Sequence, residues 1–365
     1  MQLSDLDFSL PVERIAQYPL PVRSASRLLV LERATGRWQD RQFVELPELL
    51  HGDELLVTNN ARVIPARLFG RRVGVHASPP SRATRREHLS AQIEILLTRQ
   101  VDGEIWEALV RPGRKMRTGE RLRFGEGELE AEVISRGEFG LRRLRFHSRD
   151  AVPLAEHLER LGHVPLPPYI SRQDETSDRE RYQTIFAVRP GAIAAPTAGL
   201  HFTPEILAEI RKRGGEICEL TLYVGPGTFQ PIRSATLEGH RMQAEAYDIP
   251  LETAQRLRTA RKAGRRILAI GTTVVRALED AALRAESSSP DALIGAGAGD
   301  ACIYITPGFR FRVVDALLTN FHLPRSTLLA LVCAFAGLEH VLAAYRHAVQ
   351  AGYRFYSYGD CMLIR

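Results

Sequence analysis

Short apolar runs with polar flanks begin near the N-terminus and predict buried strands at 27–31 and 53–58. From about residue 91 to residue 147 the pattern changes to short segments rich in Val, Ile, Leu and aromatic residues, divided by Gly-containing turns. Regular spacing of this kind is typical of an all-β barrel or sandwich. We expect its strands at 92–99, 105–111, 121–124, 128–135 and 141–146. The polar, Pro- and Arg-rich stretch 75–90 predicts a mobile loop.

After Pro153 helical and strand-like segments alternate. Thr203 as N-cap and Pro204 at the first helical position predict a helix that ends at Gly214. Further strands are expected at 216–224, 267–270 and 316–319, and further helices at 251–263, after 271–273 and at 327–336. This alternation indicates α/β layers around a parallel or mixed sheet. The Ser-, Ala- and Gly-rich segment 285–299 predicts a surface excursion.

These patterns together predict two domains, for which 365 residues are sufficient. One is an α/β main domain with a mixed, barrel-like sheet and helices, made of residues 1–65 and 152–365. The other is an all-β barrel domain, residues 66–151, inserted after the second strand.

The composition predicts a soluble protein, because 44% of residues are apolar and 25% are charged. The N-terminus lacks the basic start and apolar run of a signal peptide. The most apolar stretch, 328–337, is too short to cross a bilayer. The four cysteines form no C-x-x-C pair and no zinc-type cluster with histidines. We therefore expect a cytoplasmic monomer with reduced thiols, no membrane contact, no metal and no iron–sulfur cluster.

The net charge of +6 is concentrated in one segment. Residues 66–151 hold 18 Arg and Lys against 12 Asp and Glu, and the rest of the chain holds 31 of each. A basic segment favours an anionic partner such as nucleic acid. The alternative is an ordinary solvated surface rich in arginine.

Four polar clusters lie at predicted strand-to-helix junctions, where α/β proteins bind ligands. Helix N-termini there offer free N–H groups to a carboxylate or phosphate. The clusters are Pro196–Thr203, Gly225–Phe229, Gly271–Glu279 and Thr319–Thr327. Singly, each has a plain structural explanation as a helix cap or a buried histidine. Together they predict a cleft with two imidazoles, several hydroxyls and an Asn.

Two further patterns have plain alternatives. Arg276 and Glu279 are three residues apart on one predicted helix, so they could form only a surface ion pair. Gly295–Asp300 is Gly-rich, but no convincing strand precedes it, so we interpret it as linker rather than as a dinucleotide site. The chain has no phosphate-binding G-x-x-x-x-G-K-[ST] loop and no G-x-S-x-G elbow.

Longer segments carry a family resemblance. They are Leu10–Pro11, Ile15–Pro19, Arg23, Ser26–Leu31, Asn59–Leu68, the four clusters and Tyr353–Ile364. The most specific are Pro-Thr-Ala-Gly-Leu-His-Phe-Thr at 196–203 and Thr-Asn-Phe-His-Leu-Pro-Arg-Ser-Thr-Leu-Leu at 319–329. Over essentially its full length the chain resembles the S-adenosylmethionine:tRNA ribosyltransferase-isomerase family of queuosine biosynthesis.

The resemblance implies a fold and a reaction. The family's fold is a larger α/β domain with an inserted β-barrel. Its members use S-adenosylmethionine as ribosyl donor, not as methyl donor or resident cofactor. The acceptor is 7-aminomethyl-7-deazaguanine at the wobble position of tRNAs with a G-U-N anticodon. The products are epoxyqueuosine-tRNA, adenine and methionine.

This chemistry needs a general base, a donor to the departing adenine and an anchor for the methionine carboxylate. We expect His201 or His322 as base or donor, and Asp360 near the amine or the sulfonium. The hydroxyls of Thr272, Thr273, Ser326 and Thr327 are expected to hold the carboxylate or the sugar. The other expected substrate-binding residues are Thr197, Gly199, Thr228, Phe229, Arg276, Glu279, Asn320 and Tyr358, and those for tRNA are Arg142, Arg143 and Arg145.

The chain departs from the family pattern at three places. Tyr223 and Gln243 stand where histidines are expected, and the region around Asp300 lacks the expected Thr. This favours His201 and His322, with His240 and Glu245 as secondary candidates. Two alternative functions stay open: a non-catalytic RNA-binding protein, and a methyltransferase, although no Gly-rich loop follows the first strand.

Overall fold

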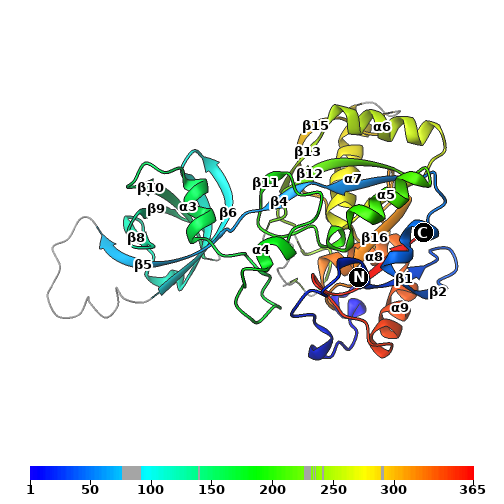
Figure 1. The fold of residues 1–365 in the computed structure, drawn as a ribbon, viewed down its shortest axis with the longest axis horizontal. Helices are drawn as coiled ribbons and strands as arrows, with labels where there is room; N and C mark the ends of the chain where they lie inside the picture. The colour runs from blue at the N-terminus through cyan, green and yellow to red at the C-terminus, as the bar shows by residue number, and fades with distance from the viewer. Residues whose placement is uncertain are drawn as a thin grey trace. The chain divides into compact units, whose positions relative to one another are not determined.

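The computed structural model describes residues 1–75, 92–138, 140–225, 232, 234, 236–240, 242–288 and 292–365. The chain forms two compact units (Figure 1). The main unit comprises 1–62, 167–173 and 181–365, and the barrel unit comprises 63–166 and 174–180. The expected loop 75–90 lies, except for Val75, outside the described residues.

The main unit is built on a mixed sheet, as predicted, and the sheet has nine described strands. In spatial order these are β15 (Gly297–Ala301), β13 (Glu245–Ile249), β12 (Glu216–Leu222), β3 (Leu55–Asn59), β14 (Ile267–Ile270), β16 (Ala316–Asn320), β17 (Cys361–Ile364), β1 (Arg27–Leu31) and β2 (Trp38–Gln42). Strands β12, β3, β14 and β16 run parallel. The order has two edges, β15 and β2, so the described sheet is open and not barrel-like. A separate two-stranded sheet pairs β4 (Ala61–Val63) with β11 (Arg189–Ala192).

In the central strands β3, β14 and β16 the side chains on both faces are buried, which explains the continuous apolar runs in the sequence. Along β14, Ile267 and Ala269 enter one core, and Leu268 and Ile270 enter the other. The first core is covered by α6 (Leu251–Lys262), α7 (Thr272–Ser288), α8 (Thr327–Ala336) and α9 (Leu338–Gln350). The second is covered by α1 (Leu46–Leu49), α5 (Pro204–Lys212) and the 3-10 helix η6 (Thr197–His201). The main unit is therefore a three-layer α/β/α structure.

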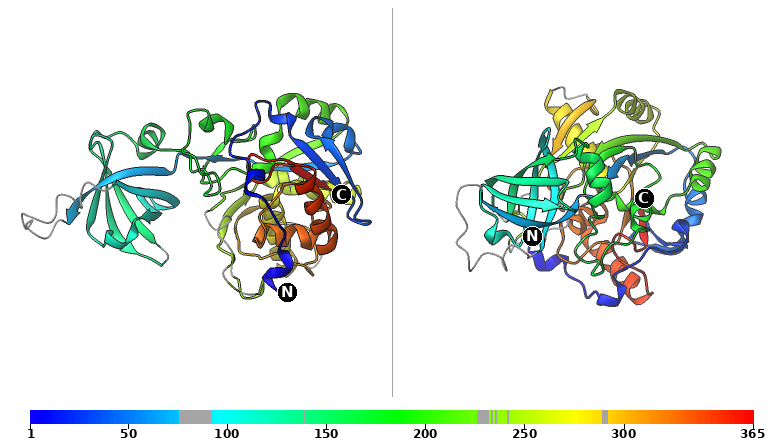
Figure 2. Two further views of the ribbon diagram at one scale, coloured as in Figure 1. Left: turned by 90° about the horizontal axis from the view of Figure 1, so that it is seen from below. Right: turned by 60° about the vertical axis from the view of Figure 1, so that its left-hand side comes forward.

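The barrel unit contains a closed, six-stranded antiparallel barrel, which confirms the predicted β-barrel (Figure 2). Its strands are β5 (Arg67–Val75), β6 (Gln92–Asp102), β7 (Ile105–Arg111), β8 (Glu120–Phe124), β9 (Leu129–Arg136) and β10 (Leu141–Ser148). Alternate side chains fill the interior, as Leu144 and Phe146 do from β10, while Arg143 and Arg145 face outward. Helices α3 (Leu154–Leu161) and α4 (Asp178–Arg181) follow the barrel strands.

The interpretation of Gly295–Asp300 as linker is wrong. Gly297–Ala301 forms edge strand β15, which pairs with β13 in register Gly299 to Tyr247. A Cβ atom on Gly299 would lie 2.5 Å from the hydroxyl oxygen of Tyr247, so glycine lets the two strands and this ring pack closely. The predicted excursion also begins too early, because α7 continues to Ser288.

Replacing Gly299 with Ala should destabilise the main unit by about 1–3 kcal/mol, because the buried Tyr247 ring would have to move. Urea unfolding would measure this. Gly295→Ala is the matched control, since a Cβ atom there meets nothing within 4 Å. Equal unfolding midpoints for the two variants would contradict the packing argument.

Candidate active site

A cavity of about 270 Å³ lies in the main unit at the carboxyl ends of β14 and β16. The two strands are parallel, so the segments that follow them meet at one edge of the sheet. Strand β17 runs antiparallel to β16 and brings the residues that precede it to the same edge. The cavity is lined mainly by Ala195–Ala198, Gly271–Thr273, Thr319–Ser326 and Tyr356–Ser357, with Tyr169, Val224 and Leu328. Three of the four predicted clusters thus converge.

Two helices begin at this cavity. Helix α7 starts at Thr272 after Gly271, whose φ of +98° strongly favours glycine. Helix α8 is capped by Ser326, whose Oγ accepts a hydrogen bond from the backbone N–H of Leu329 (3.2 Å) and donates to the carbonyl of Leu323 (2.8 Å). The buried Oγ1 of Thr273 has no hydrogen-bond partner among the described residues. This combination suits a carboxylate or sugar hydroxyls.

His322 lines the cavity and is 8% exposed. Its Nε2 lies 2.8 Å from Oγ1 of Thr319, and that hydroxyl donates to the carbonyl of Asn320 (3.3 Å). The Thr319 hydroxyl thus holds the imidazole of His322 in place beside the cavity. Burial lowers the pKa of His322 to about 3, so the ring is neutral at pH 7 and able to accept a proton.

His201 lies behind the cavity rather than in its lining. It borders a second cavity of about 20 Å³, together with Ser26 and Tyr358. Its Nδ1 is 2.7 Å from Oγ of Ser26, and its buried Nε2 makes no hydrogen bond of standard geometry. Burial lowers the pKa of His201 to about 4, and the neighbouring Asn320 side chain opposes that shift.

Asn320 supplies the cavity with an amide side chain. It is two residues before His322 in sequence, and its side chain is a neighbour of His201. Its Nδ2 donates to the carbonyl of Tyr356 (2.9 Å), whereas its buried Oδ1 has no partner among the described residues. The same side chain interacts with His201 and raises its pKa, so Asn320 links the cavity to that histidine.

Two tyrosines in the cavity lining were not predicted. The rings of Tyr169 and Tyr356 are tilted by 38° with centroids 4.1 Å apart, and the Tyr169 hydroxyl is 2.6 Å from Oγ of Ser357. Tyr356 has φ +74°, a strained conformation for a non-glycine residue, and its buried hydroxyl has no partner in the described part of the chain. Tyr169 lies outside every helix and strand, so no periodic pattern marks it.

Asp360 is 1% exposed and is not in the cavity lining. Its two carboxylate oxygens accept hydrogen bonds from the backbone N–H groups of Arg27 (2.9 Å) and Arg354 (2.8 Å). Burial raises its pKa, and these hydrogen bonds oppose the shift. In this structure Asp360 joins the start of β1 to the segment before β17.

Arg276 and Glu279 are both buried and do not pair with each other. Arg276 forms an ion pair with Glu245 and donates to the carbonyl of Ala301 (2.9 Å). Glu279 accepts the backbone N–H groups of 312, 313 and 314 at 2.8–3.0 Å. The alternative of a surface ion pair between them is therefore wrong. Neither side chain lines the cavity.

The remaining expected residues divide among several places. Thr197 lines the cavity, whereas Thr327 is buried with Oγ1 unpaired among the described residues. Gly199 packs in η6, where a Cβ atom would lie 2.8 Å from Cγ2 of Thr184. His240 is only partly buried and its ring contacts Tyr304 edge-on. Thr228 and Phe229 lie outside the described residues.

The three arginines expected to bind tRNA differ strongly. Arg142 is buried, and its guanidinium donates to the carbonyls of Met116 (2.9 Å), Gly113 (2.7 Å) and Leu141 (2.7 Å). Its donors are thus used inside the barrel unit. Arg143 is exposed and forms an ion pair with Glu107 (3.3 Å). Arg145 is exposed on the same strand.

The buried neutral histidines make stability depend on pH. An unfolded histidine takes up a proton below pH 6.5, whereas His201 does so only near pH 4, so folding free energy is lost as pH falls through this window. We expect His201→Gln to remove about 2 kcal/mol of the destabilisation between pH 7 and pH 5. Urea midpoints at both pH values measure it, with His51→Gln, an exposed position, as control. An unchanged pH dependence in His201→Gln would contradict the buried neutral state.

No three His, Cys, Asp or Glu side chains of the described residues come together as a metal site. In the same part of the chain, no single helix is long and apolar enough to span a membrane. Helices α8 and α9 meet the length and composition requirements only as a pair, which is bent by 116°.

Comparison with known proteins shows the family of the chain and agrees with its fold. The chain is 52% identical to an S-adenosylmethionine:tRNA ribosyltransferase-isomerase of Solibacter usitatus and 48% identical to one of Moorella thermoacetica, each over the full length of both chains. It is also similar to the crystal structure of S-adenosylmethionine tRNA ribosyltransferase from Thermotoga maritima, with 37% identity, a TM-score of 0.52 and coverage of 99% of this chain and 100% of that one. The family model described as queuosine biosynthesis protein matches residues 3–364. The chain therefore belongs to the queuosine biosynthesis protein family.

Proposed function

We propose that this protein is an S-adenosylmethionine:tRNA ribosyltransferase-isomerase. It transfers and isomerises the ribosyl group of S-adenosylmethionine onto 7-aminomethyl-7-deazaguanine at the wobble position of tRNA, and releases adenine and methionine. The observation that carries this proposal is the full-length match to enzymes of that name, combined with a cavity built from the matching segments.

The cavity offers the groups that this reaction requires. The sulfonium of the donor acidifies the adjacent C5′–H bonds, so a neutral base can remove a proton there. His322 is suited to this role, because it lines the cavity and its ring is neutral at pH 7. The N-terminus of α7, with Thr272 and Thr273, is suited to the methionine carboxylate, and that of α8, with Ser326 and Thr327, to the sugar hydroxyls.

Adenine must be held and must gain a proton as it leaves. The Tyr169–Tyr356 pair presents aromatic surface to the adenine ring, and Asn320 adds an amide side chain to the cavity lining. His201, Asp360, Gly199 and Tyr358 support this arrangement from outside the larger cavity. We propose positioning roles for them, with His201 as the closest to a direct role because its Nε2 is unpaired.

Other parts of the proposal follow from the reaction. Residues 1–65 and 152–365 form the catalytic domain and residues 66–151 the inserted domain. The tRNA carries a G-U-N anticodon with the deazaguanine precursor, and the enzyme works in the cytoplasm as a monomer, with no resident cofactor. Exposed Arg143 and Arg145 can contact tRNA phosphates from the outer face of β10.

One incubation tests the reaction. Protein, S-adenosylmethionine and precursor-containing tRNA should yield adenine and methionine, and tRNA lacking the precursor should not. Release of S-adenosylhomocysteine would indicate methyl transfer. Binding of tRNA with neither product would leave a non-catalytic RNA-binding protein.

A further inference from the structure

The barrel unit carries charges of opposite sign at its two ends. The end where β7 and β9 finish and β8 and β10 begin we call the basic end, and the other we call the acidic end. The basic end bears Arg111, Arg114, Arg117, Arg121 and Arg136. The acidic end bears Asp102, Glu104, Glu126, Glu128, Glu130 and Asp150.

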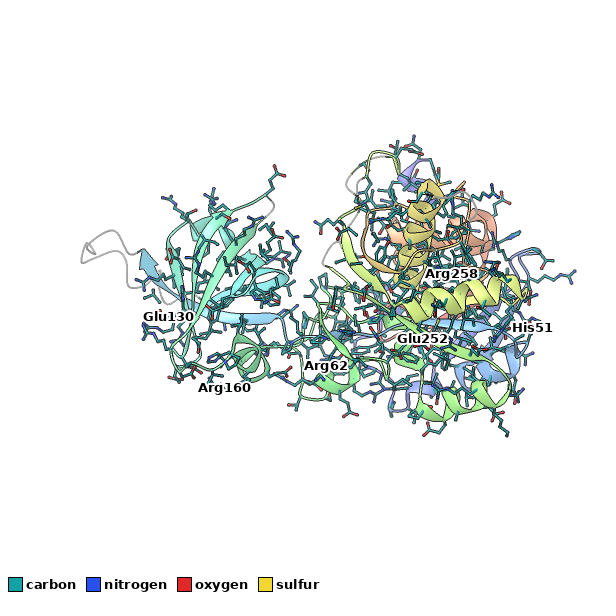
Figure 3. The ribbon with its side chains drawn as sticks, turned by 90° about the horizontal axis from the view of Figure 1, so that it is seen from above. His51, Arg62, Glu130, Arg160, Glu252 and Arg258 are labelled. Atoms are coloured by element: carbon teal, nitrogen blue, oxygen red, sulfur yellow. The ribbon has the colours of Figure 1, made fainter. Side chains whose placement is uncertain are left out.

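The arginines at the two ends are in different states. At the acidic end, Arg123 and Arg149 pair with Glu130, and Arg160 pairs with Glu128 (Figure 3 labels Glu130 and Arg160). At the basic end, none of the five arginines has an ion pair or a side-chain hydrogen bond within the described ranges. All are exposed except Arg121, which is half-buried. Glu138 is the exposed carboxylate among the described residues of this end.

Buried Arg142 organises the basic end. Its guanidinium holds the carbonyls of Gly113 and Met116, and so fixes the loop between β7 and β8 that carries Arg114 and Arg117. Arg142 is the register partner of Arg136 across β9 and β10, so two like charges lie close together. Burial lowers the pKa of Arg142, as does the positive charge of Arg136. Such an arrangement costs free energy in the free protein and is relieved by a polyanion.

We infer that the basic end of the barrel is a docking surface for the phosphate backbone of RNA. Unpaired guanidiniums on a rigid closed barrel suit phosphate oxygens, which they can bind in a bidentate manner. Three acids at the acidic end form no ion pair among the described residues: Asp102, Glu104 and Glu126. They repel the same polyanion and so orient it. The choice of tRNA as this RNA rests on the proposed function.

The test is tRNA binding by a basic-end variant, Arg111→Gln with Arg117→Gln and Arg136→Gln. The matched control is Arg123→Gln with Arg149→Gln and Arg160→Gln, which removes the same charge from the acidic end. With a tRNA transcript near 0.1 M salt, we expect the basic-end variant to raise the Kd roughly tenfold or more. The slope of log affinity against log salt should fall by about 3, because each of the three arginines neutralises one phosphate in the complex. The control should change Kd less than twofold.

Equal losses of affinity in the two triple variants, or no loss in either, would overturn the inference, since only net charge would then matter. A second result would also overturn the inference. In it, the wild type binds anionic phospholipid vesicles, and the basic-end variant loses this binding while its tRNA affinity is unchanged. The corresponding triple Lys variant keeps the charge but not the bidentate geometry, so its Kd should lie between those of the wild type and the Gln variant. Equal urea midpoints for the wild type and the Gln variant show that unfolding is not the cause of the lost affinity. Adenine release is measured separately. If the wild type binds tRNA but releases no adenine, the proposed reaction is refuted. If tRNA binding is then lost in the basic-end variant and kept in the acidic-end control, the docking surface is still supported.

Discussion

Replacing His322 with Ala should lower the rate of adenine release by roughly 10²–10⁴-fold, the range over which a positioned general base contributes. The side chain lines the cavity, is held at Nε2 by Thr319, and is neutral at pH 7. Because the lost contribution belongs to the chemical step, kcat should fall more than KM rises. Single-turnover adenine release with precursor-containing tRNA measures the effect.

His347→Ala is the matched control, since that ring lies on α9 and pairs with Asp40, away from the cavity lining. It should retain near-normal turnover. His201→Ala provides the second comparison. We expect a smaller loss there if His201 positions Asn320, and a loss of equal size if its unpaired Nε2 contacts the substrate. Near-normal turnover in both His201→Ala and His322→Ala would remove the histidines from the proposal.

Replacing Arg276 with Leu should destabilise the main unit by about 3–5 kcal/mol, because it leaves the Glu245 carboxylate buried without its cation. Both side chains of this ion pair are 3% exposed, and the Glu245 carboxylate also accepts the backbone N–H of Gly225 (2.9 Å). Breaking such a pair is costly, since a buried carboxylate loses the cation that compensates its charge. Urea unfolding at pH 7 measures the change.

Arg284→Leu is the control on the same helix. Arg284 is 51% exposed and pairs with Asp280, so its loss should cost about 1 kcal/mol or less. A similar small cost for Arg276→Leu would show that the Glu245 carboxylate is not held as a buried charge. The result bears on the site as well, because Gly225 is the first residue of the predicted cluster that ends at Phe229.

The charged positions show why residue type alone misplaces function. Arg142, Arg143 and Arg145 look equivalent in sequence, yet the alternation of β10 buries the first and exposes the other two. Asp360 stands in a strongly matching segment, but both of its oxygens are taken up by backbone N–H groups. Arg276 and Glu279 share a helix, and their partners come from β13, β15 and the segment before β16. Partners so distant in sequence leave no local pattern.

The local sequence pattern was sufficient to predict the bounds of helices and strands where that pattern reflects burial or capping. The apolar runs at 27–31 and 267–270 are strands with the predicted bounds, because both faces of a central strand are covered. The helix 327–336 also has its predicted bounds, since a Ser N-cap and a terminal Gly mark it. Strand β15 was missed because a glycine-rich edge strand has no apolar period. Its Gly299 is required by the Tyr247 ring of another strand.

The sequence by itself determined the family, the mixed α/β sheet with a β-barrel, and three of the segments that form the cavity. These depend on local periodicity, capping and motif, which are properties of neighbouring residues. Only the tertiary structure decided which polar groups face a cavity, which are buried against backbone, and which arginines remain unpaired within the described residues. Those properties depend on strand order and on contacts between residues hundreds of positions apart, such as Arg27 with Asp360. The burial or pairing of a side chain depends on residues from several distant segments, so the sequence of one segment cannot predict it.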